Sequence, residues 1–226
     1  NWLGIFWDQE FSQSDHIKRY DSIKKDLVDM GRVYECFETP AELDLKRKKL
    51  LSMGKPPVYD RASLQLSEKE KEKLRSEKPS YWRFKLNNEV VEWRDSILGN
   101  QSINPSTVSD PVIVKADGQY LYTLASVVDD IDYGVTDIIR GSDHVTNTAV
   151  QIQIFKALSK PVPNFGHHSL LIDLDGKALF KRDGSLNLKT LKNSGIEPMA
   201  IVSLLVSLGS AHAIELYKNF KEIFDT

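Results

Sequence analysis

The stretch YLYTLASVVDDIDYGVTDIIRGSDHVTNTAVQIQIFKAL, residues 120–158, decides the fold. Its first part, Tyr120 to Val128, is rich in residues that favour β-structure and predicts a strand closed by a polar turn. Val135 to Ile139 is short, β-branched and apolar, which predicts a buried parallel strand. A polar loop, Ser142 to Asn147, then leads into an amphipathic helix whose apolar residues share one face: Val150, Ile154, Phe155 and Leu158. This order of elements is typical of an α/β fold, in which polar residues at strand ends line a crevice.

Arg140 directly follows the second predicted strand, at the end where α/β folds bind ligands. Its guanidinium is a fixed cation with a forked set of donors, which suits a carboxylate or a phosphate. A salt bridge to Asp129 or Asp130 is the alternative, and the residues alone favour neither. The acidic group Asp129, Asp130 and Asp132 also has two interpretations: it holds Mg²⁺ with a nucleotide or, as is commoner, it caps a strand and its turn.

The amino-acid composition limits the classes to which the protein can belong. Among 226 residues, 41% are hydrophobic and 27% are charged, and no apolar run approaches the length of a membrane span. These values predict a soluble globular protein of one large or two modest domains, with no membrane partner. The formal charge of −2 gives no overall drive toward nucleic acid, so RNA binding would depend on local basic patches. The single cysteine, Cys36, excludes an internal disulfide and a multi-cysteine zinc cage, and cytoplasmic localisation is the simplest expectation.

Local signals predict most of the other elements. Capping boxes at Thr39 and Ser67 predict two helices, one running to about Met53 and one ending before Pro79. Apolar spacing predicts helices at 20–30, 198–208 and 213–224, and strand patterns occur at 81–86, 90–93, 111–115 and 169–173. The Asn87-Asn88 pair is expected to join two of these strands as a hairpin.

Several side chains receive a structural interpretation. His16 is expected at the surface, and His167 and His168 are expected on opposite faces of a strand edge. The first capped helix carries Lys46, Arg47, Lys48 and Lys49. These cations could meet RNA phosphates, although a solvated helix face is the commoner meaning. The residues expected in the core are Met53, Trp82, Phe84, Trp93 and Met199.

The segment KALFKRDG, residues 177–184, follows the last predicted strand. Its three cations are Lys177, Lys181 and Arg182. Flexible ammonium and guanidinium groups on a loop bounded by glycines suit a triphosphate, because they can follow charge as it moves to a leaving group.

Many segments together resemble one family. They are WLGIFWDQEFSQSDHIKRY, YECFETPAEL, PPVYDRASLQLS, YWRFKL, LYTLASVVDDID, DIIRG-DHVTNTAVQIQIF, KRDG and GIEPMAIVSLLVSLGS. In this order they resemble bacterial glutamyl-tRNA synthetases, which are class I aminoacyl-tRNA synthetases, in their alphaproteobacterial form. The resemblance covers nearly the whole chain. It implies a fragment without the upstream ATP-binding signature and without the anticodon-binding domain, and such a fragment is expected to turn over poorly alone.

The resemblance implies a fold and its division. The fold is α/β: a Rossmann-like parallel sheet with an inserted α+β subdomain and the start of a helical region. Residues 1–33 would end the first half of the catalytic domain, and 34–116 would form the subdomain that receives the tRNA acceptor end. Residues 117–172 would form the second catalytic half, and 173–226 the signature loop and the start of the stem-contact region.

The resemblance also implies site residues for an ATP-dependent glutamate–tRNA ligase. Tyr122 and Arg140 would bind glutamate, and Asp143, His144, Leu179 and Lys181 would bind ATP, which arrives with Mg²⁺. The signature loop would be Ala178, Leu179, Phe180, Lys181 and Arg182, with Lys181 as the catalytic residue. The implied partners are glutamate, ATP and the glutamate tRNA, and the implied state is a monomer. Some relatives bind zinc in the inserted region, but here only Cys36 remains, near Glu38 and Ala62, so no zinc is expected.

Two positions depart from the family pattern. Ser142 replaces an acidic residue, and Phe180 replaces the serine expected just before the loop lysine. A phenyl ring cannot donate to a phosphate, which leaves open a degenerate tRNA-binding paralogue without catalysis. Compensation by Lys177 or Arg182 is an equal alternative. A synthetase that also charges glutamine tRNA with glutamate is the third interpretation.

Overall fold

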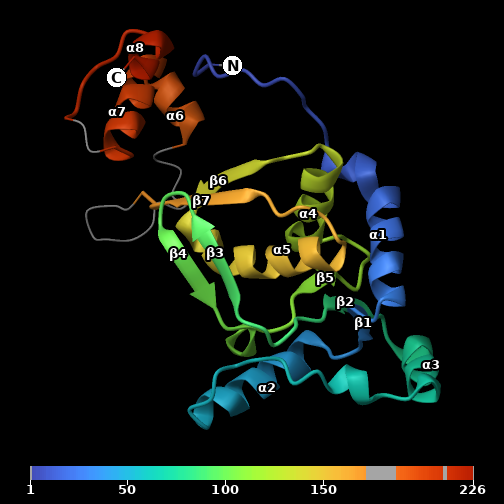
Figure 1. Ribbon diagram of the computed structural model, residues 1–226. Coiled ribbons are helices and arrows are strands. Elements are labelled where there is room, and N and C mark those ends of the chain that lie inside the picture. The colour runs from blue at the N-terminus through green and yellow to red at the C-terminus, as the bar shows by residue number, and fades with distance from the viewer. Residues whose placement is uncertain (1, 172–186, 211–212, 226) are drawn as a thin grey trace. The chain divides into compact units, whose positions relative to one another are not determined.

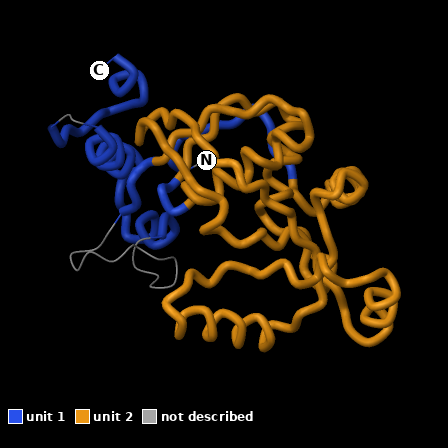
Figure 2. The backbone as a smooth tube through the Cα atoms, turned by 60° about the horizontal axis from the view of Figure 1, so that its bottom comes forward, with its two compact units in different colours: residues 1–11, 141–143, 168–226 blue, residues 12–140, 144–167 orange. Residues whose placement is uncertain are grey.

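The computed structural model describes residues 2–171, 187–210 and 213–225. By their contacts these residues form two compact units (Figure 2). The larger unit comprises residues 12–140 and 144–167, and the smaller unit comprises the described parts of 1–11, 141–143 and 168–226.

The larger unit contains helices, two sheets and short 3₁₀ turns (Figure 1). Its α-helices are α1 (Ile17–Asp29), α2 (Pro40–Ser52), α3 (Glu68–Glu77), α4 (Tyr122–Asp132) and α5 (Val145–Ala157). The strands are β1 (Val33–Cys36), β2 (Tyr81–Phe84), β3 (Val91–Asp95), β4 (Gly99–Ile103), β5 (Val112–Val114), β6 (Asp137–Gly141) and β7 (Asn164–His168). The 3₁₀ turns are η1 (Gln13–His16), η2 (Ala62–Gln65) and η3 (Pro105–Thr107). Of a fourth turn, η4 (Ser142–His144), only His144 belongs to this unit, and the last residues of β6 and β7, Gly141 and His168, belong to the smaller unit.

The strands form two sheets, of order β1-β2-β5 and β4-β3-β7-β6. The first sheet is antiparallel throughout. In the second, β3 and β4 form an antiparallel hairpin, and β3 runs parallel to β7 with Asp95 opposite Phe165. This pairing places the end of β3 beside the start of β7. The mixed α/β architecture agrees with the predicted fold class.

Helix α5 lies in the middle of the larger unit (Figure 1). One side, with Val150, Ile154 and Phe155, packs into a core shared with α1, α4 and the first sheet. Another side, with Ala149 and Ile152, packs against β3 and β7. Residues 148–155 are therefore all buried, whereas the sequence predicted a single apolar face.

The prediction of a strand at 120–128 is wrong, because Tyr122–Asp132 is helix α4. Leu124, Val127 and Val128 are 0–1% exposed in the main core, at the spacing of one helix face. Burial against α1 and α5 outweighs the β-preference of the individual residues. The second predicted strand exists as β6, but it lies at the edge of its sheet, and Ile139 is 61% exposed rather than buried.

Three further predictions need correction. Strands β2 and β3 belong to different sheets and form no hairpin. The Asn87 backbone between them instead hydrogen-bonds Gln153 of α5 (N···Oε1 2.7 Å, Nε2···O 3.2 Å). Among the described residues the last strand is β7 at 164–168, so 169–171 is not a strand, and 172–173 lies outside the described residues. Met53 is 55% exposed rather than buried, whereas Phe84 is fully buried and Trp82 and Trp93 pack at core edges.

Local signals performed better for the helices. Both predicted capping boxes form, at Thr39 and Ser67, and they begin α2 and α3. Helix α1 also agrees with its prediction, and Gly31 follows it with φ +66°, which L-residues rarely adopt.

The smaller unit contains α6 (Leu188–Asn193), α7 (Pro198–Leu208) and α8 (Phe220–Phe224). Helix α7 agrees with the sequence prediction, but the helix predicted at 213–224 is confined to 220–224. Residues before α8 instead lie beside α7, where Tyr217 N donates a hydrogen bond to Ser203 Oγ (2.9 Å). In the described parts of the chain, no helix is long and apolar enough to cross a membrane.

Candidate active site

Arg140 lies in β6, and its half-buried guanidinium is held by four neutral acceptors. Nη1 donates to Tyr122 Oη (2.8 Å), and Nη2 donates to Thr148 Oγ1 (2.6 Å) and Gln151 Oε1 (2.7 Å). Nε faces His167 Nε2 at 3.3 Å. Among the described residues no carboxylate forms an ion pair with Arg140, so the alternative of a salt bridge to Asp129 or Asp130 is wrong.

The helical conformation of 122–132 explains how Tyr122 reaches this site. Tyr122 is the first residue of α4, and its ring is partly exposed beside His144, with ring centroids 5.4 Å apart. One turn later, Ser126 Oγ accepts from Gln151 Nε2 (2.7 Å), which ties α4 to α5. Two residues that the sequence predicted for different ligands, Tyr122 and His144, therefore lie side by side in the larger unit.

Behind Arg140 lies a fully buried pair that the sequence analysis missed. The side chains of His167 and Asp95 are both 0% exposed, and His167 Nδ1 lies 2.5 Å from Asp95 Oδ2. Asp95 Oδ1 accepts from the backbone N–H groups of Ile97, Leu98 and His167 at 2.9–3.0 Å. Burial alone would raise the pKa of Asp95, but the hydrogen bonds from Leu98, His167 and Ile97 lower it to well below its usual range.

The expected alternation at His167 and His168 is confirmed, since His167 is buried and His168 is exposed, but the prediction of a strand edge is wrong, because β7 lies between β3 and β6. No sequence signal marked His167 as part of the Arg140 site. Its contact with Asp95 depends on the pairing of β7 with β3, which are far apart in the chain. Thr148 and Gln151 were missed for another reason: the predicted single apolar face of α5 left its polar residues without an assigned role.

The acidic residues of α4 have separate partners. Buried Asp129 accepts hydrogen bonds from Tyr20 Oη (2.8 and 2.9 Å) and Gln13 Nε2 (2.8 Å), and it faces His16 Nδ1 (3.0 Å). Asp132 accepts two hydrogen bonds from Arg19. Burial, followed by the charge of Asp129, raises the pKa of Asp130 to about 6, against an opposing effect of Arg140. Across 2–171, 187–210 and 213–225, no group of His, Cys, Asp and Glu side chains could hold a metal ion.

His16 is more constrained than the predicted surface histidine. Its ring is partly buried, and it stacks on Tyr133 with centroids 5.7 Å apart and an interplanar angle of 23°. Together with its contact to Asp129, this arrangement fastens the start of α1 to α4.

Gly141 and Asp143 lie in the smaller unit. A Cβ atom added at Gly141 would lie 2.5 Å from Asp143 Oδ1 and 2.8 Å from Leu170 Cδ2. The Asp143 carboxylate is therefore folded back over the backbone of Gly141, in space that only glycine leaves free. The signature-loop residues predicted from the sequence, Ala178, Leu179, Phe180, Lys181 and Arg182, lie outside the described residues.

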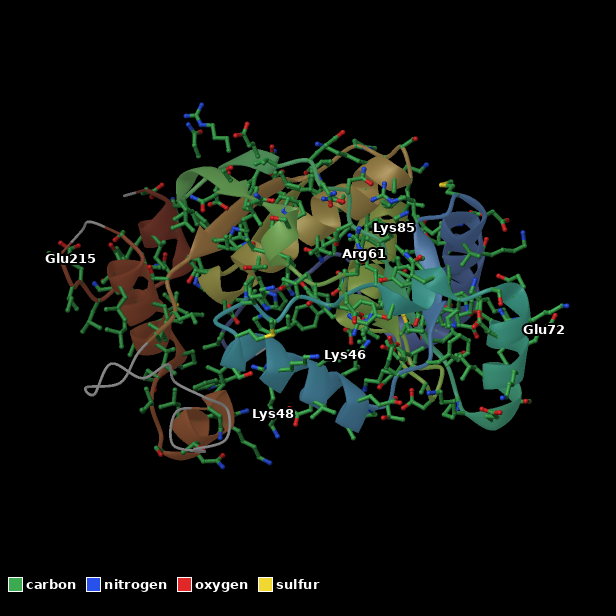
Figure 3. All side chains as sticks on the ribbon, turned by 90° about the horizontal axis from the view of Figure 1, so that it is seen from below. Lys46, Lys48, Arg61, Glu72, Lys85 and Glu215 are labelled. Atoms are coloured by element: carbon green, nitrogen blue, oxygen red, sulfur yellow. The ribbon has the colours of Figure 1, made fainter. Side chains whose placement is uncertain are left out.

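The predicted basic helix face is not a single face. Lys46 points to Asp60 and Glu38 (2.9 and 3.5 Å), whereas Lys48 pairs with Asp44 (2.7 Å). Figure 3 shows these two lysines leaving α2 on different sides. These contacts favour the interpretation of a solvated helix with local ion pairs, although Arg47 and Lys49 are exposed.

Cys36 has Ser63, rather than Ala62, in its cluster. The Tyr59 hydroxyl lies 2.8 Å from Glu38 Oε1, 3.2 Å from Ser63 Oγ and 3.6 Å from Cys36 Sγ. Burial raises the pKa of the Cys36 thiol to about 11, so the thiol stays protonated at neutral pH. The described side chains in this cluster are linked to one another by hydrogen bonds.

Comparisons with known proteins agree on one family. Residues 1–225 match the family described as tRNA synthetases class I (E and Q), catalytic domain. A protein of Cereibacter sphaeroides named glutamate–tRNA ligase 2 is 57% identical over 222 residues, which are 98% of this chain and 50% of that protein. Glutamate–tRNA ligase 1 of Ruegeria pomeroyi is 57% identical over 226 residues, which are 100% of this chain and 51% of that protein. The chain thus spans about half the length of the curated relatives it matches.

Solved structures show the same relationship at lower identity. Glutamate tRNA ligase from Elizabethkingia meningosepticum, crystallised in complex with its amino acid, has a TM-score of 0.77 at 28% identity, covering 90% of this chain and 48% of that one. Glutamate-tRNA synthetase from Elizabethkingia anophelis has a TM-score of 0.81 at 28% identity, covering 95% of this chain and 52% of that one.

Proposed function

This chain belongs to the family of class I tRNA synthetases for glutamate and glutamine, within their catalytic domain, and from this premise we propose that its protein is an ATP-dependent glutamate–tRNA ligase. In the first step, an oxygen of the glutamate α-carboxylate forms a bond to the α-phosphorus of ATP. The bond from that phosphorus to the bridging oxygen breaks, and pyrophosphate leaves with Mg²⁺. In the second step, a hydroxyl of the terminal adenosine of tRNA attacks the glutamyl carbonyl carbon, and AMP leaves.

The hydrogen bonds of Arg140 are the observation that supports this proposal. A guanidinium has five N–H donors, and the four contacts of Arg140 engage Nε–H, both Nη2–H groups and one Nη1–H. One Nη1–H has no acceptor among the described residues. Beside it, the Tyr122 hydroxyl accepts from Arg140 and keeps its own hydrogen to donate. Two adjacent donors with a fixed positive charge form a clamp for one carboxylate of glutamate.

We place the other substrates by family resemblance. Asp143 and His144 would contact the ribose and base of ATP, and Lys181, within the loop 178–182, would bind the triphosphate. Residues 34–116 would receive the acceptor end of the tRNA, and 173–226 would begin the region that contacts its stem. The protein's task is to align the carboxylate with the α-phosphate and to stabilise the charge that develops there.

Glutamate-dependent exchange of pyrophosphate into ATP, measured with the protein that contains this chain and in the presence of glutamate tRNA, tests the proposal. We expect exchange with glutamate and much less with aspartate or glutamine. Arg140→Ala removes the charged half of the clamp and should lower kcat/KM for glutamate by about a hundredfold. Arg94→Ala removes an exposed charge and serves as the matched control. The proposal fails if Arg140→Ala behaves like the control.

Phe180 favours a second candidate, a tRNA-binding paralogue without catalysis, because a phenyl ring replaces a phosphate-binding hydroxyl in the signature loop. Binding of glutamate tRNA without any exchange activity, and recovery of exchange in Phe180→Ser, would establish this candidate. Charging assays with glutamate tRNA and glutamine tRNA separately would show whether the ligase also acts on the second tRNA. The 226-residue chain alone is expected to charge either tRNA poorly.

A further inference from the structure

His167 connects a buried negative charge to the cation of the candidate glutamate site. Its two ring nitrogens face opposite ways: Nδ1 lies 2.5 Å from Asp95 Oδ2, and Nε2 lies 3.3 Å from Arg140 Nε and 2.9 Å from Thr148 Oγ1. The three charged or polar side chains come from three neighbouring strands of one sheet, β3, β7 and β6. This line of contacts ends at the guanidinium that we assign to substrate.

The contacts of His167 select one tautomer. An ionised carboxylate only accepts hydrogen bonds, and Asp95 is held ionised by its own backbone donors, so Nδ1 must carry the proton. A bare Nε2 can then accept from Arg140 Nε–H or from the Thr148 hydroxyl. A proton on Nε2 as well would make an imidazolium, whose N–H would point toward the N–H of a second cation. The neutral Nδ1–H form is the one that satisfies all three partners.

We propose that His167, fixed by Asp95 in the neutral Nδ1–H tautomer, is the positioning residue for Arg140 in the glutamate site. The inference rests on the proposed function, because it assumes that Arg140 binds glutamate. Nε2 supplies the acceptor that orients the guanidinium about its long axis, so that Nη1 faces Tyr122 while Nη2 faces Thr148 and Gln151. His167 itself makes no contact with substrate.

Asp95 gives this arrangement a second effect. Arg140 has no carboxylate partner among the described residues, and a direct carboxylate would compete with the carboxylate of glutamate for the guanidinium. The carboxylate of Asp95, placed one imidazole further away, occupies none of the Arg140 donors. The charge of Arg140 also acts on the carboxylate of Asp130, with which it forms no ion pair. The ring of Phe165, 5.4 Å from the Arg140 guanidinium carbon, covers another side of the cation.

The first test is spectroscopic and needs no activity. Long-range ¹H–¹⁵N correlation spectra of the 226-residue chain with labelled histidine should show a protonated Nδ1 and a bare Nε2 at one buried residue at pH 7.5. His167→Gln identifies the signal by its disappearance. In Asp95→Asn, the carboxamide oxygen can keep the backbone donors while its NH₂ group faces Nδ1, so the signal should change to the Nε2–H tautomer. An Nε2–H form or an imidazolium in the wild-type chain would overturn the proposal.

The second test measures the Michaelis constants of pyrophosphate exchange in the protein that contains this chain. His167→Asn can still reach Asp95 but is too short to accept from Arg140, and we expect KM for glutamate to rise about tenfold or more while KM for ATP stays within about twofold. His167→Gln can bring an amide oxygen near the place of Nε2 and should recover much of the loss. His168→Asn, at the neighbouring exposed histidine, should leave both constants unchanged.

Equal KM values for glutamate in wild type and His167→Asn, or equal increases for glutamate and ATP, would contradict the positioning role. Melting temperatures of the variants identify any that fail to fold, and for those the tautomer in wild type and Asp95→Asn decides. If wild-type protein shows no glutamate-dependent exchange, the proposed function fails by itself. The spectrum then still shows whether His167 presents an acceptor to Arg140.

Discussion

Asp110 shows how much of the larger unit depends on one buried carboxylate. It is 2% exposed, and its oxygens accept from Arg61 Nε and Nη2 (both 2.8 Å), Tyr34 Oη (2.7 Å) and Leu86 N (3.0 Å). Arg61 reaches it from a backbone with φ +57°, a conformation that non-glycine residues adopt only when their surroundings require it. The carboxylate thereby joins the loop before η2 to β1 and to the end of β2.

We expect Asp110→Asn to lower the free energy of unfolding by about 2–4 kcal/mol, because the amide loses the charge-assisted pairing with Arg61 and turns a donor toward other donors. Urea denaturation followed by circular dichroism measures this change. The matched control is Asp44→Asn, whose pair with Lys48 is exposed and should matter by less than about 0.5 kcal/mol. Similar losses in the two variants would show that the Asp110 network contributes no more than a surface pair.

Gly141 limits the position of Asp143, the residue that we assign to the ATP ribose. In Gly141→Ala the new methyl group would displace the Asp143 carboxylate and the Leu170 side chain, from which it would lie only 2.5 and 2.8 Å away. Both obstacles are side-chain ends, so the fold should tolerate the change while KM for ATP rises several-fold. Exchange assays at varied ATP measure this effect, with Asp143→Ala as reference. An unchanged KM in Gly141→Ala, beside a raised one in Asp143→Ala, would refute the role given to glycine.

At the scale of elements, α4 makes the larger unit sensitive to pH through Asp130. Burial and the charge of Asp129 raise the pKa of Asp130 to about 6 in the folded state, above the unfolded value of about 3.9. Since the folded state binds this proton more tightly, the favourable contribution is complete below about pH 4 and is lost as pH rises through about 6.

Asp130→Asn should remove this dependence. The difference in free energy of unfolding between variant and wild type should therefore be about 1–2 kcal/mol more in favour of the variant at pH 8 than at pH 4, after allowance for partial exposure. Denaturation of both proteins at the two pH values gives the difference, in which other titrating groups cancel. A stability difference that is independent of pH would contradict the raised pKa.

The elements that the sequence predicted correctly have local causes. Thr39 and Ser67 each specify a helix start through residues three positions away, so α2 and α3 could be predicted without knowing the fold. Helix α4 could not, because Leu124, Val127 and Val128 are β-forming or neutral residues whose conformation is decided by packing on α1 and α5. The same limit applies to the candidate site. Arg140 was singled out by its position at the end of a predicted strand and Tyr122 by resemblance, whereas Asp95 and His167 gain their meaning only from the pairing of β3 with β7.

At the scale of the whole molecule, the described hydrophobic cores all lie in the larger unit. The first joins α1, α4 and α5 to the antiparallel sheet, and the second joins α5 to β3 and β7. The third lies on β1 and β2, against residues of α2, η2 and β5. Every residue of these three clusters falls within 20–165. A domain with its own cores is expected to fold without the remainder of the chain.

A chain of residues 12–168 should therefore unfold in one cooperative transition and should keep the Nδ1–H signal of His167, because Asp95, Arg140 and Thr148 are all retained. Thermal denaturation, monitored by near-ultraviolet circular dichroism, distinguishes fixed packing of the buried aromatic residues from a loosely packed state. Loss of that signal with retained helical signal would mean that the larger unit requires residues of the smaller unit to pack its cores. Cooperative unfolding together with an altered His167 signal would instead separate the stability of the fold from the geometry of the glutamate site, and would assign the positioning of Arg140 to contacts beyond residues 12–168.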